Sequence, residues 1–349
     1  MEFSSQPLND RWCFLKRIGK GSFGEIYSAY DMVLQENVAI KIEPISKDEK
    51  RLSLLLEISI LKKLQGCPYA TQFIHCGKNL HYRFLIMELL GKNLSQLLKE
   101  QTFHQFSLLT TIKLGIQMIS AIEYVHKIGF VHRDIKPSNF AIRKNVQNQP
   151  DKELCCILDF GLAKRFLEKD GKYRPPRLGV GFRGTARYAS LSAHQKQDLS
   201  RKDDLISLYY SLIEFLKGSL PWSHLKDRDE IMKLKIRYNN LELCQGLPPE
   251  FTQFFLHLQS LGYSDEPNYK YLRSLLRNIS VREGFGNGKY DWEIQEEQMM
   301  SIHTDSKETS DSGNQIKIYK METDSNGQIN LKEFVTSFKN EKERKKKEK

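Results

Sequence analysis

The first part of the chain, to about residue 90, alternates short apolar runs with glycines and polar turns. β-branched and aromatic residues flanked by turn residues are typical of strands, and they occur in CFLKRI (13–18), EIYSAY (25–30) and NVAIKIE (37–43). The apolar run RFLIMELLG (83–91) is typical of a buried strand, whereas residues 48–66 carry apolar side chains at helical spacing. We therefore predict a strand-rich first part with one helix.

From about residue 92 the pattern changes to longer amphipathic segments. Helical spacing is clear in residues 93–100, 109–129 and 204–218. A strand-rich part followed by a helix-rich part predicts an α+β protein with two lobes. We expect an N-lobe over about residues 12–90 and a C-lobe over about residues 91–293.

After residue 293 the composition becomes polar. Residues 294–313 are expected to form a polar linker, because they contain too few apolar side chains to build a core. Residues 314–349 form a tail that ends in KNEKERKKKEK, a charged and solvated stretch.

Composition narrows the class of protein but not its partner. Hydrophobic residues make up 40% of the 349, which is enough for a sizeable core. The net charge of +11 favours anionic partners, which include phosphates, acidic peptides, nucleic acid and anionic membranes. The six cysteines form no CxxC pair, the first residues carry no signal pattern, and no unbroken apolar run reaches the length of a membrane span. We expect a cytoplasmic protein that is not inserted in a membrane.

The sequence GKGSFGEIY supplies the first chemical signal. Its glycines, Gly19, Gly21 and Gly24, would let the backbone come close to phosphate groups because no Cβ intervenes. The alternative is an ordinary hairpin turn. A dinucleotide site is disfavoured, because a strand rather than a helix follows the glycines.

The strand VAIK supplies the second signal. A lysine on a buried strand, here Lys41, needs a counter-charge or a phosphate. Glu57 on the following predicted helix is a candidate ion-pair partner. The alternative is a lysine that only reaches solvent.

Two further motifs carry acidic and amide side chains. In HRDIKPSN, Asp134 can accept a proton from a hydroxyl, and Asn139 offers a neutral oxygen to a hard cation. In LDFG, Asp159 offers a carboxylate to the same metal.

The four motifs, in this order, resemble those of the protein kinases over about residues 12–293. The stretches LDFGLAK, GTARYAS and RKDDLISLYYSLIEFLKGSLPW resemble the casein kinase I superfamily. RPPR, GFRGTARYAS, LPPEFTQFF and YDWE are most similar to its tau-tubulin kinase branch. The resemblance implies a two-lobed kinase fold with a strand-rich N-lobe and a helical C-lobe.

The resemblance also implies an ATP site between the lobes. The glycine loop would cover the triphosphate, and Lys41, held by Glu57, would bind the α- and β-phosphates. Around the adenine, Met87 would be the gatekeeper residue, and the backbone of Glu88 and Leu90 would form hydrogen bonds with the base. Ala39 and Ile26 would cover its two faces.

The same resemblance assigns the catalytic and metal residues. Asn139 and Asp159 would hold Mg²⁺, Asp134 would orient and deprotonate the attacking hydroxyl, and Lys136 would steady the transferring γ-phosphate. Asp204 would pin the catalytic loop as a structural residue.

A basic segment follows the LDFG motif. Residues 162–183 carry seven basic side chains and two acidic ones, with no serine or threonine between Gly161 and Thr185. Tyr173 is its one hydroxyl, so we expect the enzyme to be active without phosphorylation there and the basic side chains to meet the anion of another molecule. By resemblance, Arg187, Gly218 and Lys226 form an anion pocket for acidic or already phosphorylated protein substrates. The alternative is a solvated basic surface that only steers anions.

The tail contains ETDSNGQINLKE, which resembles a degenerate EF-hand calcium loop. Asp324, Asn326 and Glu333 fall at ligand positions, although Glu322 replaces the usual first aspartate. The alternative is an Asn-Gly turn before a short helix. The basic end RKKK is a candidate nuclear signal or simply a solvated end.

Three function classes follow from these observations. A non-specific serine/threonine protein kinase using ATP and Mg²⁺ accounts for all four motifs. A pseudokinase scaffold that binds phosphorylated partners is the alternative, and intact Lys41, Asp134, Asn139 and Asp159 argue against it. A nucleic-acid binder is least favoured, because the basic residues that we can place gather around a phosphoryl-transfer site.

Overall fold

The structure is a computed structural model that describes residues 7–21, 24–45, 53–143, 154–168, 170–238 and 240–305. The chain divides into two compact units, Met1–Glu296 and Glu297–Lys349. The first unit contains both lobes of the predicted fold.

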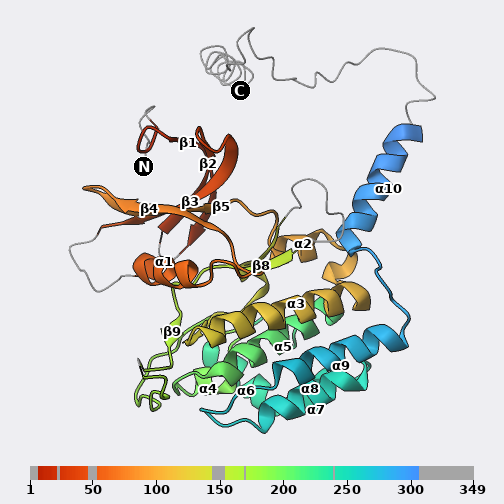
Figure 1. Cartoon of the computed structure of the whole chain (residues 1–349). Helices are drawn as coiled ribbons and strands as arrows, with labels where there is room; N and C mark the ends of the chain where they lie inside the picture. Colours follow the sequence, from red (N-terminus) through yellow and green to blue (C-terminus); the bar gives the residue numbers. More distant parts are fainter. Residues whose placement is uncertain are drawn as a thin grey trace. The chain divides into compact units, whose positions relative to one another are not determined.

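The N-lobe is built on a five-stranded antiparallel sheet with the strand order β1-β2-β3-β5-β4. Figure 1 shows this sheet with helix α1 beside it. The elements are β1 (Trp12–Gly21), β2 (Gly24–Asp31), β3 (Glu36–Pro44), α1 (Ser53–Lys63), β4 (Phe73–Lys78) and β5 (Tyr82–Glu88).

The two faces of the sheet bury different cores. Side chains alternate between the faces of a strand, so Ile40 and Ile42 of β3 join one cluster with Trp12, while Ala39 belongs to the main core of the unit. Lys41 shares the face of Ala39. The alternation of β3 therefore directs this lysine away from the outer cluster and toward α1, where Glu57 lies buried.

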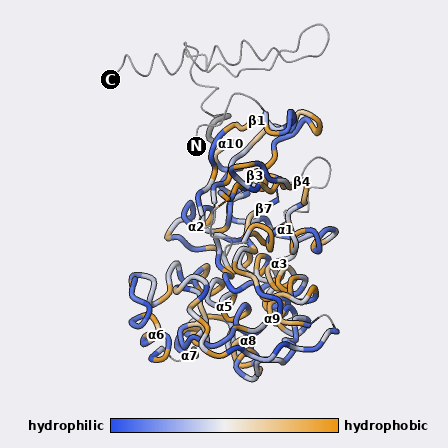
Figure 2. The backbone as a smooth tube through the Cα atoms, turned by 90° about the vertical axis from the view of Figure 1, so that its left-hand side faces the viewer, coloured by the Kyte–Doolittle hydropathy of each residue, from blue (hydrophilic) through white to orange (hydrophobic). Residues whose placement is uncertain are grey.

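The C-lobe is organised around helix α3 (Leu108–Lys127), which packs against α5 (Arg201–Lys217) and α9 (Tyr269–Arg282) (Figure 1). Among the described residues, α3 is the one helix long and apolar enough, by composition, to cross a membrane. More than half of its apolar stretch is buried within this unit, which is the position of a core helix. In Figure 2 hydrophobic and hydrophilic positions alternate along these packed helices, as expected for amphipathic elements.

The remaining elements connect the sheet and the helical core. Two short sheets pair β6 (Phe130–Val131) with β9 (Lys164–Arg165) and β7 (Phe140–Arg143) with β8 (Leu154–Ile157). The other helices are α2 (Leu94–Glu100), η1 (Thr102–His104), η2 (Pro137–Asn139), α4 (Leu191–His194), α6 (Arg228–Arg237), α7 (Asn240–Leu243), α8 (Pro249–Gln259) and α10 (Asp291–Asp305). The predicted α+β, two-lobed architecture is confirmed.

The ends of some elements differ from the sequence pattern. The predicted helix 48–66 is the shorter α1, and residues 46–52 lie outside the described part. Helix α10 continues to Asp305, through the beginning of the segment predicted as a polar linker. The rest of that segment and the whole tail, including Asp324, Asn326, Glu333 and the basic end, lie outside the described residues.

Candidate active site

A cleft of about 380 Å³ lies between the N-lobe strands on one side and, on the other, the loop that precedes β7 and the loop that follows β8. Ten of the fourteen residues predicted for catalysis, ATP and Mg²⁺ line it, namely Gly21, Gly24, Ile26, Lys41, Glu57, Met87, Asp134, Lys136, Asn139 and Asp159. Gly24, the first residue of β2, lies close to the neighbouring strand, because a Cβ on it would lie 1.9 Å from the carbonyl oxygen of Ile42. Glycine is therefore required at this position of the cleft.

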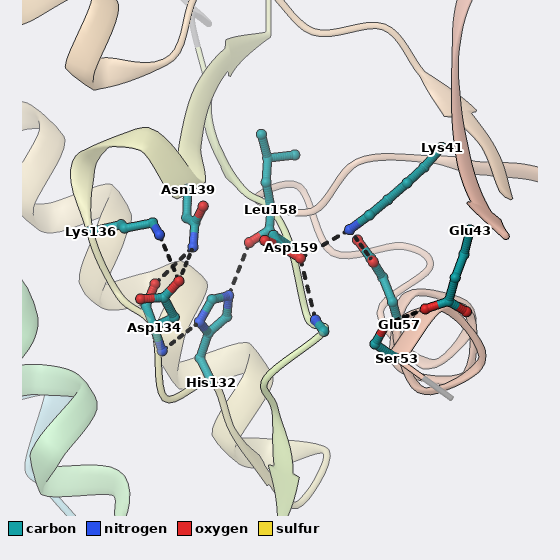
Figure 3. Close-up of polar contacts among 11 residues, drawn as sticks. Lys41, Glu43, Ser53, Glu57, His132, Asp134, Lys136, Asn139, Leu158 and Asp159 are labelled. Atoms are coloured by element: carbon teal, nitrogen blue, oxygen red, sulfur yellow. Dashed lines mark hydrogen bonds and ion pairs between the residues drawn. The ribbon is translucent and has the colours of Figure 1, made fainter. Parts of the chain in front are cut away.

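Two buried charges, those of Lys41 and Glu57, meet the half-exposed carboxylate of Asp159 in the cleft (Figure 3). The Nζ of Lys41 lies 2.6 Å from Oε2 of Glu57 and 3.0 Å from Oδ1 of Asp159. Burial opposes the charge of Lys41, but the two carboxylates outweigh it, so the pKa of Lys41 is raised above its ordinary value. Burial would raise the pKa of Asp159, but the Lys41 ammonium lowers it below its ordinary value. The structure thus brings these three side chains together, with the pKa of Glu57 raised above its ordinary value by burial and lowered again in part by the Lys41 ammonium.

The catalytic loop forms a second cluster around Asp134 (Figure 3). Its Oδ2 accepts a hydrogen bond from Lys136 Nζ at 2.7 Å. The side-chain amide of Asn139 donates to the backbone oxygen of Asp134 at 2.9 Å and to Oδ2 at 3.3 Å. With its nitrogen used in this way, Asn139 keeps its amide oxygen for another ligand. An amide oxygen and the carboxylate of Asp159 form a suitable donor pair for a magnesium ion that is also held by substrate phosphates.

Thr185 completes the Asp134 cluster, and the sequence did not predict this role. Its hydroxyl donates to Oδ1 of Asp134 at 2.8 Å and accepts from Lys136 Nζ at 3.0 Å. The neighbouring Gly184 makes the approach feasible, because a Cβ there would lie 2.6 Å from the carbonyl oxygen of Arg133. The position of Thr185 between LDFG and the following helices was the available signal, but its contact depends on packing between segments about fifty residues apart.

Asp204 holds the catalytic loop, as the resemblance implied. Its buried carboxylate accepts from the backbone N–H groups of His132 at 2.7 Å and Arg133 at 2.8 Å. His126 lies 2.8 Å from the same carboxylate. The ring of His132 in turn lies 3.0 Å from the carbonyl oxygen of Leu158, directly before Asp159 (Figure 3). One buried network therefore joins the two motifs that carry Asp134 and Asp159.

Two non-glycine residues of the site adopt the left-handed conformation. Arg133 has φ 68° and Asp159 has φ 62°. Holding a non-glycine residue in this conformation costs on the order of 1–3 kcal/mol. The conformation is therefore found where the surrounding contacts fix the backbone. Arg133 directly precedes Asp134 and Asp159 is itself a proposed metal ligand, and functional sites are where such strain is commonly found.

The residues predicted to surround an adenine differ from one another in burial and in the contacts they make. Ala39 and Met87 are buried and face each other in the β3–β5 register, whereas Leu90 follows β5. Glu88 carries an unpredicted contact, because its carboxylate binds Arg143 through two hydrogen bonds of 2.6 and 2.8 Å. Arg143 also donates to the carbonyl oxygens of Pro68 and Ala70. This arginine thereby connects the end of β5 to β7.

Gly19 of the glycine motif lies on β1 opposite Ile26.

The proposed anion-pocket residues lie in the C-lobe. Arg187 is engaged within the chain, where it donates to Glu214 at 3.2 Å and to the carbonyl oxygen of Ser223 at 2.9 Å. Gly218 ends α5 in the left-handed conformation, with φ 75°. Lys226 is exposed. Arg187 therefore has a structural partner as well as any partner outside the chain.

The basic segment differs from the expectation based on its charge. Lys164 and Arg177 bind Asp198, Arg174 binds Glu168, and Lys172 lies 3.3 Å from Asp170. These four side chains have carboxylate partners within the chain, so they give no support to the expectation that they meet the anions of another molecule, which stays a prediction. Arg165 is half-buried, Arg183 is exposed, and Lys169 lies outside the described residues.

Comparisons with known proteins agree with this geometry. Residues 12–270 match the family model described as protein kinase domain. The chain is 48% identical over 289 residues to a protein of Dictyostelium discoideum described as a probable serine/threonine-protein kinase. The alignment covers 82% of this chain and 57% of that relative, so the chain spans little more than half of the relative's length. With the motif residues assembled in one cleft and most of the folded chain matched, the chain belongs to the protein kinase family.

Proposed function

We propose that the chain is a serine/threonine protein kinase of the non-specific type, which transfers the γ-phosphate of ATP to a hydroxyl of a protein substrate. One observation carries this proposal: the Lys41–Glu57–Asp159 cluster and the Asp134–Lys136–Thr185 cluster are both assembled in the same cleft. Phosphoryl transfer depends mainly on positioning and on stabilising charge. An arrangement with every charged group in place is what such a reaction needs.

Each residue of the cleft has a role in this proposal. Lys41 binds the α- and β-phosphates of ATP, and Asn139 and Asp159 hold Mg²⁺, which when bound neutralises phosphate charge. Asp134 accepts the proton of the attacking hydroxyl, and Lys136, whose Nζ lies 2.7 Å from Oδ2 of Asp134, would steady the γ-phosphate. A pseudokinase scaffold gains no support from this cleft, since none of these groups is replaced.

We further propose that the kinase belongs to the casein kinase I superfamily, near its tau-tubulin kinase branch, and prefers acidic or already phosphorylated substrates. Arg187, Gly218 and Lys226 are the candidate pocket for the substrate anion. The exposure of Lys226 and the half-exposed side chain of Arg187 support this proposal. Since four basic side chains of residues 162–183 are paired within the chain, and Arg187 is paired with Glu214, the exposed Lys226 is the best candidate for contact with the substrate anion.

The proposal is tested by incubating the protein with ATP and Mg²⁺ and with phosphorylated, acidic and neutral peptides that differ only at the position near the target serine. We expect transfer to serine or threonine, with the highest kcat/KM for the phosphorylated peptide. Asp159→Asn is the matched control, because it keeps the shape of the side chain and removes its charge. Absence of transfer by the unmodified protein would contradict kinase activity. Equal kcat/KM for the three peptides would contradict only the substrate preference.

A further inference from the structure

Asp198 lies in the loop between α4 and α5 and binds several donors of the basic segment. It accepts hydrogen bonds from the backbone N–H of Arg177 at 2.9 Å and from its guanidinium at 3.1 and 3.2 Å. The Nζ of Lys164 binds the same carboxylate and also lies 3.2 Å from the hydroxyl of Tyr263. One carboxylate therefore connects β9, the middle of the basic segment and the loop before α5.

The surroundings of Asp198 are strongly cationic. Its side chain is only 1% exposed, and that of Lys164 is 10% exposed. Burial would raise the pKa of Asp198, but the donors from Arg177 and Lys164 lower it well below its ordinary value. The carboxylate of Asp198 also favours the charged form of Arg133 in the catalytic loop. Burial and the charge of Arg177 oppose it and lower the pKa of Arg133 to about 10. The cationic groups here outnumber the one carboxylate.

The connection reaches the catalytic loop through the backbone. Lys164 on β9 pairs with Val131 on β6, the residue directly before His132. A shift of β9 would therefore be transmitted to the loop that presents Asp134. In kinases with a phosphorylated activation segment, the added phosphate orders the segment by pairing with basic side chains. Here no serine or threonine lies between Gly161 and Thr185 to carry one.

On these grounds we propose that Asp198 is a positioning residue, a built-in anion that orders the basic segment in place of a phosphate and so keeps Asp134 and Thr185 aligned. The proposal rests on the proposed kinase function and adds the group that makes segment phosphorylation unnecessary.

Tyr173, which carries the one hydroxyl of the segment, has its ring and backbone engaged within the chain. The guanidinium of Arg201 lies 5.0 Å from the ring centroid of Tyr173 and 5.2 Å from that of Phe166. The two rings lie 5.4 Å apart, and Tyr173 forms a β-bridge with Leu167. Arg201 follows the Asp198 loop directly, at the beginning of α5. A second set of contacts therefore fastens the segment to the same region, independently of the carboxylate.

The first test compares Asp198→Ala with the unmodified protein. We expect kcat/KM for peptide phosphorylation to fall by about 10- to 100-fold, because a small misplacement of catalytic groups has effects of that size. Nucleotide affinity should stay within about twofold, because Asp198 does not line the ATP cleft. Asp198→Glu should recover part of the loss. Asp170→Ala is the matched control, since it removes an exposed carboxylate of the same segment whose ion-pair partner in the described part of the chain is Lys172.

The second test asks whether an anion is what the site needs. Asp198→Ala leaves Lys164 and Arg177 without their carboxylate, beside a cavity of about 320 Å³ lined by Arg133, Arg177 and Arg183. Added inorganic phosphate should restore kcat/KM of the variant at least several-fold, compared with chloride at the same ionic strength. The unmodified protein should not respond in this way.

A third readout does not depend on kinase activity. Trypsin should cleave after Arg177 faster in Asp198→Ala than in the unmodified protein, because the segment loses its anchor, and phosphate should slow this cleavage. Failure of the proposed function would appear as an inactive unmodified protein that still shows this difference in cleavage.

Three results would overturn the positioning role of Asp198. The first is unchanged kcat/KM and unchanged cleavage in Asp198→Ala. The second is a loss that phosphate does not reverse. The third is a loss of nucleotide binding as large as the loss of transfer, which would show a general structural role. If Asp198→Ala does not fold, the same three criteria are applied to Asp198→Asn, which preserves side-chain volume. Failure of both variants to fold counts as the third result.

Discussion

The catalytic cleft and the basic segment of residues 162–183 are both rich in charge. The sequence nevertheless predicted the contacts of the charged side chains in the cleft better than those in the segment. In the cleft, Lys41 and Glu57 form the ion pair expected from their motifs. In the segment, charge composition suggested contacts with an external anion, but Lys164 and Arg177 turn inward to Asp198. A motif specifies residue types at fixed spacing and hence a local geometry. Net charge determines only the electrostatic field around a segment, and it does not determine which carboxylate pairs with each basic side chain.

The charge pairs of the two regions also differ in how deeply they are buried. The side chains of Lys41 and Glu57 are 8% and 4% exposed, whereas those of Lys172 and Asp170 are 84% and 54% exposed. Breaking a buried pair by removing one partner costs about 3–5 kcal/mol, and an exposed pair contributes about 0–1 kcal/mol. Substitutions should therefore have graded effects, large in the cleft, intermediate at Asp198 and small at the surface.

The largest effect is expected for Asp134→Asn. Removing the proposed general base should lower kcat by about 100- to 10,000-fold. The melting temperature should change little, because the amide oxygen can still accept a hydrogen bond from Lys136 while the amide nitrogen donates one to the hydroxyl of Thr185. Steady-state kinetics and thermal unfolding measure the two quantities. Near-normal turnover on a peptide would show that Asp134 is not the base.

The next effect concerns the unpredicted contact of Thr185. Thr185→Val removes the hydroxyl that bridges Asp134 and Lys136 and keeps the side-chain shape. A hydrogen bond to a charged group is worth about 1.5–3 kcal/mol, so kcat should fall by about 10- to 100-fold. Thr185→Ser, which retains the hydroxyl, should recover most of the rate. A variant with valine as active as one with serine would refute a role for the bridge.

A pH series should show the buried charge of Asp198 in the stability of the protein. At neutral pH, Asp198→Asn should lower the free energy of unfolding by about 1.5–3 kcal/mol, since the carboxylate loses charge-assisted hydrogen bonds. The folded-state pKa of Asp198 lies below its unfolded value of about 3.9, so this stabilisation is fully present above that value and is lost as the pH falls through the folded-state pKa. Urea unfolding at several pH values measures it. A difference between the two proteins that grows on acidification would contradict the account.

A smaller effect is expected at the proposed substrate pocket. Lys226→Ala should lower kcat/KM for the phosphorylated peptide by about two- to fivefold, because exposed ion pairs rarely exceed 1 kcal/mol. The neutral peptide should be unaffected, and Lys233→Ala on α6 serves as an exposed-lysine control. Lys226 is a cleaner test than Arg187, whose removal would leave the buried Glu214 without its cation. An equal loss for both peptides would remove Lys226 from the pocket.

The smallest effect is expected for the exposed pair Lys172–Asp170. Lys172→Ala should change the free energy of unfolding by less than about 0.5 kcal/mol and leave kcat/KM for the neutral peptide unchanged. Chemical denaturation and steady-state kinetics check this. A loss comparable to that of Asp198→Asn would show that burial does not grade the charge pairs of this segment.

The sequence was sufficient for contacts that depend on a motif and a nearby element. A lysine on a buried strand required a partner, and Glu57 on the next helix was within reach. It was not sufficient for Thr185, Arg143 or Asp198, whose contacts join segments far apart in the chain. Such contacts depend on how loops pack, and neither hydrophobic periodicity nor composition contains that information. The calcium-loop interpretation of the tail stays a prediction, because Asp324 lies outside the described residues.

The account's central claim is that the cleft is assembled for catalysis without a phosphate on the basic segment. The most direct test is the time course of peptide phosphorylation by phosphatase-treated protein, with mass spectrometry of Tyr173 and Thr185 at each time point. The account predicts product formation that is linear from the beginning while both residues remain unmodified. A lag that disappears when either residue becomes phosphorylated, or activity that an upstream kinase must restore, would contradict it.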